Sequence, residues 1–281
     1  MTKKVLIVGC GDLGGELASQ LQAHGISSIG LRRSAVPHSI FQCVQADVLQ
    51  PSTLSDIAKL NPDFLVYCVA ATAQTDENYR QHYVEGLRNV LVALEDASNL
   101  KHVFFVSSTR MYGQTTEALL DENTAPLATD FGGERLLEAE NLLKQYAKNW
   151  AHTALRLTGI YGPGRTRMLT LASNPSNWPM QNTWSNRIHR DDAAGFIVHL
   201  LQMLLAKHPV QDCYIVTDSC PVSQHEVLHW IANEMGLATG NELPSVVGGK
   251  RMSNQRMLAT GFRLKYADYK LGYSAMLNNK A

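Results

Sequence analysis

The sequence predicts an α/β fold built on a doubly wound parallel sheet, with a smaller C-terminal lobe. Residues 5–8 form an unbroken apolar run, and three glycines and a helix-like pattern follow it. Short buried runs then alternate with helical patterns as far as residue 157, as in βαβ units joined by right-handed crossovers. A length of 281 residues leaves room for one further lobe.

Composition excludes several classes of protein. The chain has 25 Lys and Arg residues against 25 Asp and Glu residues, with no long run of one sign, so we expect neither a nucleic-acid nor a membrane-surface partner. No apolar run is long enough to span a membrane, and the N-terminus lacks a signal-peptide pattern. The five cysteines form no C-x-x-C pair, and their spacing to His and carboxylate residues gives no metal motif. A cytoplasmic protein is the expectation.

The first glycines follow the G-x-G-x-x-G spacing. Gly9 permits a tight strand-to-helix turn, Gly11 lets a pyrophosphate approach the backbone, and Gly14 lets the helix pack on the strand. The N–H groups of the next turn, at Asp12 and Leu13, would face the phosphates, where the helix dipole favours negative charge. An ordinary glycine turn is the alternative. The buried strand before the motif and the amphipathic helix after it favour a Rossmann-type dinucleotide site.

The second expected strand, residues 26–31, ends in Arg32 and Arg33. A fold that prefers NAD usually has an acidic residue here, which holds the ribose 2′-hydroxyl. Two guanidiniums instead suit a 2′-phosphate in charge and geometry. A pair of solvated arginines is the alternative. The cofactor is therefore predicted to be NADP or NAD, with NADP favoured.

The remaining patterns complete the fold. Further strands are expected at residues 41–44, 64–69, 103–106, 150–157 and 213–217, and helices at 51–60, 76–98, 191–205 and 223–235. Residues 1–157 are predicted to form the NAD(P)-binding domain, to which about 190–217 return, and 158–281 mainly the smaller lobe. Asn182, Arg187 and His189 are candidates to contact a polar or anionic substrate, and a structural hydrogen bond is the alternative for His189.

Five short motifs resemble, in order, those of the extended or atypical short-chain dehydrogenases/reductases, the NAD(P)-dependent epimerase/dehydratase group. They are the glycine motif, ADV at 46–48, SSTRMYG at 107–113, YGPGR at 161–165 and IHRDD at 188–192. The resemblance covers nearly the whole chain. It implies that Asp47 and Val48 contact the cofactor near the adenine, that Ala70 and Ala71 line it, and that the C-terminal lobe shapes the site of a small-molecule substrate such as a nucleotide sugar.

The family's chemistry uses a Ser, a Tyr and a Lys, and this chain departs from that set. By resemblance, Ser108 is the family's serine, whereas Phe131 stands in the place of the Tyr and Arg135 in that of the Lys. A phenyl ring has no proton to transfer, and loss of a positioned general acid typically costs about 10²–10⁴-fold in rate. Arg135 could still hold the cofactor ribose, so it is predicted to bind the cofactor.

Substitute proton donors are Tyr112 and Tyr161, which lie in loops at strand ends, and Asp130 beside Phe131. Each has a structural alternative: a packing residue, a loop residue and a helix N-cap, respectively. The predicted catalytic residues are therefore Ser108, Tyr112 and Tyr161. Two functions remain open, an epimerase/dehydratase-like oxidoreductase and an inactive NAD(P)-binding sensor or adaptor. The oligomeric state is not predicted.

Overall fold

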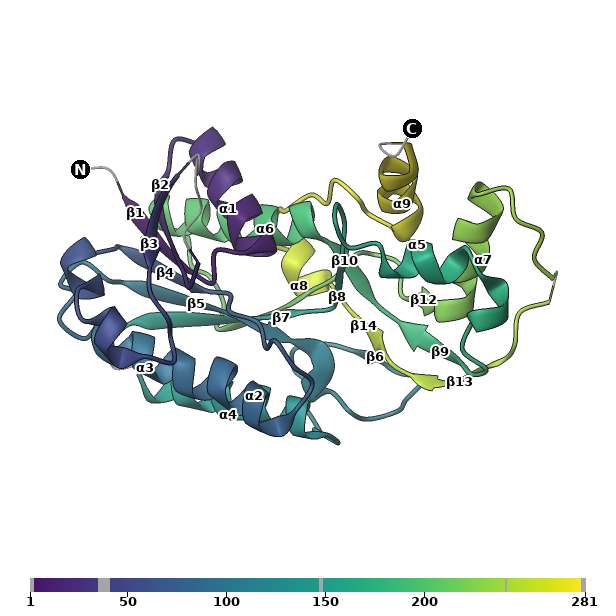
Figure 1. Cartoon of the computed structure of the whole chain (residues 1–281), viewed down its shortest axis with the longest axis horizontal. Helices are drawn as coiled ribbons and strands as arrows, with labels where there is room; N and C mark the ends of the chain where they lie inside the picture. The colour runs from purple at the N-terminus through teal and green to yellow at the C-terminus, as the bar shows by residue number, and fades with distance from the viewer. Residues whose placement is uncertain (1–2, 35–40, 147–148, 241, 279–281) are drawn as a thin grey trace. The chain divides into compact units, whose positions relative to one another are not determined.

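The computed structural model describes residues 3–34, 41–146, 149–240 and 242–278. The chain divides into two compact units (Figure 1). Unit 1 consists of Met1–Gly113, Pro126–Arg156 and Ala194–Tyr214, and unit 2 of Gln114–Ala125, Leu157–Ala193 and Ile215–Ala281. The segment Gln114–Ala125, which the sequence prediction placed in the first domain, belongs to unit 2.

A seven-stranded sheet in the order β11-β7-β5-β4-β1-β2-β3 confirms the predicted doubly wound architecture. The pairs β1–β2, β1–β4, β2–β3 and β4–β5 are all parallel. The side chains on both faces of the central strands are apolar and buried, as expected for a parallel sheet. The strands are β1 Lys4–Val8, β2 Ser27–Arg32, β3 Gln42–Gln45, β4 Phe64–Tyr67, β5 His102–Ser108, β7 Ala151–Leu157 and β11 Cys213–Val216.

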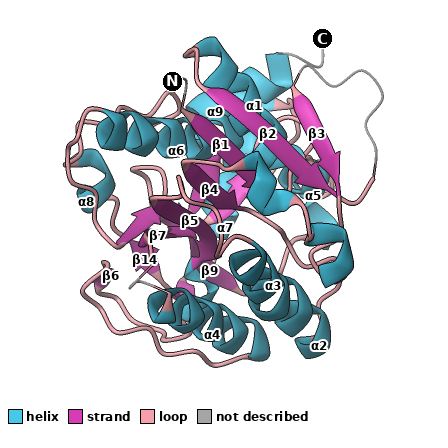
Figure 2. Ribbon diagram, turned by 90° about the vertical axis from the view of Figure 1, so that its left-hand side faces the viewer, coloured by secondary structure: helices cyan, strands magenta, loops and turns pink. Residues whose placement is uncertain are grey.

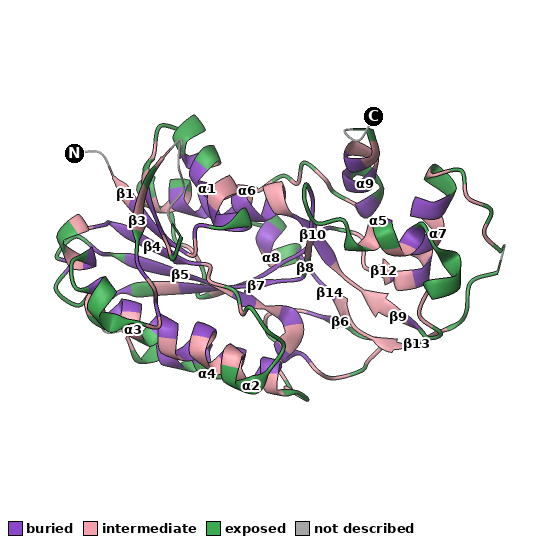
Figure 3. Cartoon of the chain, viewed as in Figure 1, coloured by how far each residue is buried: buried purple, intermediate pink, exposed green. Residues whose placement is uncertain are grey.

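Helices cover both faces of this sheet. In Figures 1 and 2, α1 and α6 lie on one face and α2, α3 and α4 on the other. Their bounds are α1 Asp12–Ala23, α2 Asp76–Tyr79, α3 Gly86–Ala93, α4 Phe131–Gln145 and α6 Arg190–Leu205. Figure 3 shows the buried residues of these helices turned toward the strands.

Two helix predictions need correction. The helix expected from Pro51 is a pair of 3₁₀ turns, Pro51–Leu54 and Ile57–Leu60. The single helix expected over 76–98 is interrupted by a π-helical segment, Arg80–Glu85, and ends at Ala93. The hydroxyl of Tyr67 on β4 donates to the carbonyl of His82 inside that segment. A side chain that enters the backbone ladder in this way is a known cause of a local change of helix type.

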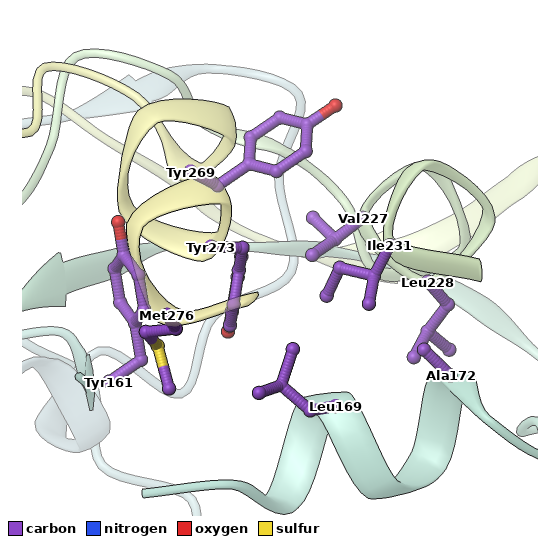
Figure 4. Packing of buried hydrophobic residues seen from close by; sticks show 9 residues of the cluster. All are labelled: Tyr161, Leu169, Ala172, Val227, Leu228, Ile231, Tyr269, Tyr273 and Met276. Carbon is purple, nitrogen blue, oxygen red and sulfur yellow. The ribbon is translucent and has the colours of Figure 1, made fainter. Parts of the chain in front are cut away.

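Unit 2 contains short strands and helices. Three small sheets pair β8 with β10, β9 with β12 and β13, and β6 with β14. The strands are β6 Leu119–Leu120, β8 Gly159–Tyr161, β9 Asn182–Ser185, β10 Arg187–His189, β12 Val222–Ser223, β13 Val246–Gly249 and β14 Arg251–Met252. The helices are α5 Arg167–Ala172, α7 Gln224–Glu234, α8 Gln255–Leu258 and α9 Tyr269–Asn278. Apolar residues of α5, α7 and α9 form its core together with Tyr161 (Figure 4).

Candidate functional site

The turn between β1 and α1 has the steric form that the glycine spacing predicts. Gly9 has φ +90°, and a Cβ there would lie 2.6 Å from the backbone nitrogen of Val69. A Cβ on Gly14 would lie 2.7 Å from the carbonyl oxygen of Gly9. Nothing lies within 4 Å of a Cβ built on Gly11. The protein itself therefore requires glycine at positions 9 and 14, whereas position 11 faces open space.

The N-terminus of α1 has no side-chain cap, as is also true of α5 and α8. Gly11 is its N-cap and provides no side-chain hydrogen bond. By contrast, Thr75 caps α2, Asp130 caps α4 and Ser223 caps α7. The Asp130 cap confirms the structural alternative that the sequence raised for this residue. A helix N-terminus without a side-chain cap, next to the open space around a Cβ at Gly11, can receive a dinucleotide pyrophosphate, so these residues fit such a cofactor.

The other predicted cofactor residues follow the carboxyl ends of neighbouring strands. Parallel register pairs Val8 with Leu31 and with Tyr67, and Leu31 with Val44, so the segments after these four strands leave the sheet along one edge. The segment after β2 carries half-buried Arg32 and exposed Arg33. The segment after β3 carries half-buried Asp47 and buried Val48, and the segment after β4 carries exposed Ala70 and half-buried Ala71.

The Asp47 carboxylate is held by the chain that follows it. Its Oδ1 accepts a hydrogen bond from the Leu49 N–H at 2.9 Å, and its own N–H donates to the Thr53 hydroxyl at 3.0 Å. Asn89 on α3 donates to the Val48 carbonyl at 2.8 Å. This loop is therefore fixed by local hydrogen bonds at the end of β3.

The residues in place of the family's Tyr and Lys both make structural contacts. The Phe131 ring meets Tyr79 edge to face, with centroids 5.4 Å apart. Arg135 binds the Asp76 carboxylate through Nε at 2.7 Å and Nη2 at 3.0 Å, and Glu138 through Nη1 at 2.7 Å. The hydrogen bond from Arg135 holds the pKa of Asp76 below its usual value. Arg135 therefore links α4 to α2, and its predicted contact with the cofactor would compete with these carboxylates.

Ser108 and Arg110 follow β5. Ser108 is half-buried, and its hydroxyl oxygen accepts a hydrogen bond from the Arg110 N–H at 3.2 Å. The Arg110 guanidinium donates through Nη1 to the Tyr79 hydroxyl at 2.7 Å and to Gln74 Oε1 at 2.9 Å, and through Nε to Asp130 at 3.0 Å. Its Cζ also lies 5.0 Å from the centre of the Phe131 ring.

Asp130 is kept ionised by its partners. Burial opposes its charge, but hydrogen bonds from Gly133 and Arg110 outweigh burial and hold the pKa of the carboxyl below its usual value. The carboxylate thus fixes both the start of α4 and the guanidinium of Arg110.

Tyr112 lies in a buried ionic cluster within unit 1. Its hydroxyl accepts a hydrogen bond from Arg156, which also donates to Glu140 at 2.7 Å and 3.0 Å. Ser107 donates to the same carboxylate at 2.7 Å. Burial raises the pKa of Tyr112 to about 12 despite the nearby guanidinium. These contacts favour the packing alternative for Tyr112 over proton transfer.

Tyr161 lies in the core of unit 2. Its hydroxyl is 3.5 Å from the Asp268 carbonyl, and its ring lies so close to α9 that a Cβ on Gly272 would overlap it. Burial raises its pKa well above the ordinary tyrosine value. These contacts favour the structural alternative for Tyr161 over proton transfer.

The three candidate substrate contacts of unit 2 differ. Asn182 donates to the Pro244 carbonyl at 2.7 Å and is occupied structurally. His189 accepts from the Asp191 N–H at 3.2 Å, as its structural alternative predicted, and burial lowers its pKa to about 4. Arg187 is buried, and its Nη1 has no hydrogen-bond partner in the protein. Asp218 is also buried, and its Oδ2 has no hydrogen-bond partner in the protein either. Burial raises the pKa of Asp218 to about 7, against the opposing effect of Arg187.

Comparison with known proteins identifies the family. Residues 5–211 match the model of the NAD dependent epimerase/dehydratase family. The chain belongs to this family. An NAD-dependent epimerase/dehydratase candidate from Methylobacillus flagellatus is 50% identical, covers 100% of this chain and 99% of its own, and superposes with a TM-score of 0.91.

Two more distant proteins extend the comparison. Protein YeeZ of Escherichia coli K12 is 27% identical over 290 residues, which cover 95% of this chain and 97% of its own. A UDP-glucose 4-epimerase of Thermotoga maritima, solved with UDP-glucose, is 13% identical, covers 99% of this chain and 100% of its own, and has a TM-score of 0.81. At that identity the likeness shows the fold alone.

Two further findings concern the described residues. No group of three or more His, Cys, Asp or Glu side chains among them is arranged to hold a metal ion. None of their helices combines the length and apolar character needed to cross a bilayer.

The sequence reasoning missed Tyr79, Gln74 and Asp218. Tyr79 and Arg110 are separated by 31 positions, and no motif joins them. The only signal was indirect: an arginine inside the SSTRMYG motif, next to a helix that had lost its tyrosine.

Proposed function

We propose that this protein is an NAD(P)-dependent oxidoreductase of the epimerase/dehydratase type that acts on a nucleotide sugar. The observation that carries the proposal is the uncapped N-terminus of α1 beside the open space at Gly11. The UDP-glucose in the T. maritima neighbour supports the choice of substrate class. The cytoplasm is the expected location.

The chain's own residues would divide the work at the cofactor. The backbone at the start of α1, at Asp12 and Leu13, would bind the pyrophosphate, and Asp47 and Val48 would flank the adenine end. Arg32 and Arg33 would donate hydrogen bonds to a 2′-phosphate, which favours NADP. Ser108 would donate a hydrogen bond to the substrate oxygen. When bound, the nicotinamide supplies a hydride acceptor or donor.

A second function is favoured by one observation, namely that Phe131 and Arg135 are both engaged in structural contacts. On this reading the protein binds NAD(P) without turning over and acts as a sensor or adaptor. The two functions differ in whether any nucleotide sugar changes the redox state of the bound cofactor.

Fluorescence titration with NADH and NADPH tests cofactor binding first. Arg32→Ala with Arg33→Ala should weaken NADPH binding by about 100-fold or more, since each lost charge-assisted contact contributes about 1.5–3 kcal/mol, and should change NADH binding little. Equal losses for both cofactors would refute the arginine assignment. The loaded protein is then mixed with a panel of UDP-sugars while the absorbance of reduced nicotinamide is followed. No change with any sugar would support the sensor.

A further inference from the structure

Tyr79 brings a phenol hydroxyl to the place where the family's tyrosine is absent. It is the last residue of α2, and its ring stands edge-on to that of Phe131, with an interplanar angle of 87° and centroids 5.4 Å apart. Phe131 opens α4 where the family's Tyr would stand. A hydroxyl is therefore present next to that position, on a different helix.

Arg110 gives this hydroxyl a permanent positive neighbour. Its Nη1 donates to the Tyr79 oxygen at 2.7 Å, and its Cζ lies 4.9 Å from the centre of the Tyr79 ring. A guanidinium in this geometry stabilises the negative charge that the oxygen carries once its proton has left. The family's lysine has a corresponding effect on its tyrosine. Arginine keeps its charge at all pH values of interest.

The guanidinium is held firmly in this position. Asp130 accepts from Nε through both carboxylate oxygens, at 3.0 and 3.1 Å. A Cβ on Gly132 would overlap the guanidinium, so this glycine allows it to lie against the first turn of α4. The backbone N–H of Arg110 donates to Ser108, the residue predicted to contact the substrate oxygen.

The Tyr79 hydroxyl has a replaceable partner. Tyr79 itself is only 7% exposed, but its hydroxyl lies 3.2 Å from Oε1 of Gln74, which is an exposed residue. Gln74 follows β4, and Ser108 ends β5, the adjacent parallel strand. The same Gln74 oxygen also accepts from Arg110 Nη1 at 2.9 Å, so a substrate oxygen that takes the place of the amide would receive both hydrogen bonds, while Arg110 keeps its contacts with Tyr79 and Asp130.

We infer that Tyr79 is the catalytic proton carrier of this protein and that Arg110 is its positioning residue, together replacing the family's Tyr and Lys. The inference rests on the proposed function. In the oxidative direction Tyr79 would act as its phenolate: the substrate hydroxyl would give its proton to the Tyr79 oxygen, and the carbon that bears this hydroxyl would give a hydride to NAD(P)⁺. The products are a carbonyl, a protonated Tyr79 and NAD(P)H, and the reverse step returns both.

A test without substrate uses nitration by tetranitromethane, a reagent that attacks phenolates, followed by peptide mapping. Arg110→Gln should slow the nitration of Tyr79 by about 10- to 100-fold relative to the wild type, the range of a charge-assisted hydrogen bond. Arg110→Lys, which keeps the positive charge, should recover part of the rate. Nitration of Tyr79 that is insensitive to Arg110→Gln overturns the inference.

Arg135→Gln is the matched control, because it removes a guanidinium that links α2 and α4 through Asp76 rather than through Tyr79. It should leave the nitration of Tyr79 unchanged. An equal loss of rate in Arg110→Gln and Arg135→Gln would show that both changes only loosen α2, and would refute the role given to Arg110.

The second readout is turnover with any UDP-sugar that reduces the bound cofactor. Tyr79→Phe should lower kcat by about 10²–10⁴-fold while cofactor affinity stays unchanged. A kcat close to that of the wild type would refute the inference. If no sugar reduces the cofactor in the wild type, the proposed function fails, and the nitration result still decides the state of the Tyr79 hydroxyl.

Discussion

Two arginines that are buried to the same degree have opposite surroundings in the two units. Arg156 in unit 1 is 7% exposed, and each of its three guanidinium nitrogens donates to Glu140 or Tyr112. Arg187 in unit 2 is 6% exposed and has Nη1 without a partner in the protein. Among the described residues, the buried side-chain atoms that lack such a partner all belong to unit 2, on Trp184, Arg187, Asp218 and Arg251. The two units therefore differ in whether their buried polar side chains have hydrogen-bond partners, and not in how deeply these arginines are buried.

The largest effect is expected where the pairing is complete. Glu140→Ala leaves Arg156 charged and buried without its carboxylate, which should lower the free energy of unfolding by about 3–5 kcal/mol in a urea titration. Asp56→Ala is the control, because its ion pair with Lys59 is largely exposed and contributes little. Similar stability losses in the two variants would contradict the importance given to buried pairing.

A smaller effect, with a distinct pH dependence, is expected in unit 2. Burial raises the pKa of Asp218 to about 7, so between about pH 4 and pH 7 the folded state binds more protons than the unfolded state. Stability should therefore fall as pH rises through this window, by at most ~4 kcal/mol for a shift of about three units. Asp218→Asn should lack this fall. Parallel pH profiles of wild type and variant, measured by urea denaturation, would contradict it.

The smallest effect concerns Arg135. Its side chain is 27% exposed and that of Asp76 is 51% exposed, so Arg135→Ala should lower stability by at most about 1 kcal/mol. Thermal unfolding measures this loss, and fluorescence titration measures the affinity for NADPH in the same variant. Because the guanidinium is committed to carboxylates, we expect the affinity to change little. A tenfold weaker affinity would instead support the cofactor contact that the sequence predicted.

The sheet could be predicted from the sequence because each determinant is local. The apolar run of β1 and the glycines that follow it specify a buried strand and a tight turn within a few residues. The π-helical segment could not be predicted, because it depends on the Tyr67 hydroxyl from a strand 15 positions earlier than His82. The helical periodicity of the sequence does not indicate a contact with a side chain from another element.

The candidate site was predictable to a similar extent. The glycine turn and the absence of the family's Tyr and Lys could be predicted from the sequence, because each depends only on the residue type at a known spacing. The side chains around Phe131 could not be predicted, because Tyr79 and Arg110 come from segments that follow different strands. Only the folded sheet brings the ends of β4 and β5 together.

The most direct test of the account is cofactor binding by Gly11→Val compared with Gly9→Ala. The protein leaves open space around a Cβ at Gly11, whereas Gly9 has φ +90° and no such space. NADPH titration and thermal unfolding of both variants should show that Gly11→Val loses cofactor affinity at unchanged stability, because its side chain fills the place of the pyrophosphate. Gly9→Ala should lose stability. Unaltered NADPH binding by Gly11→Val, or no binding by the wild type, would contradict the assignment of unit 1 as the NAD(P)-binding unit.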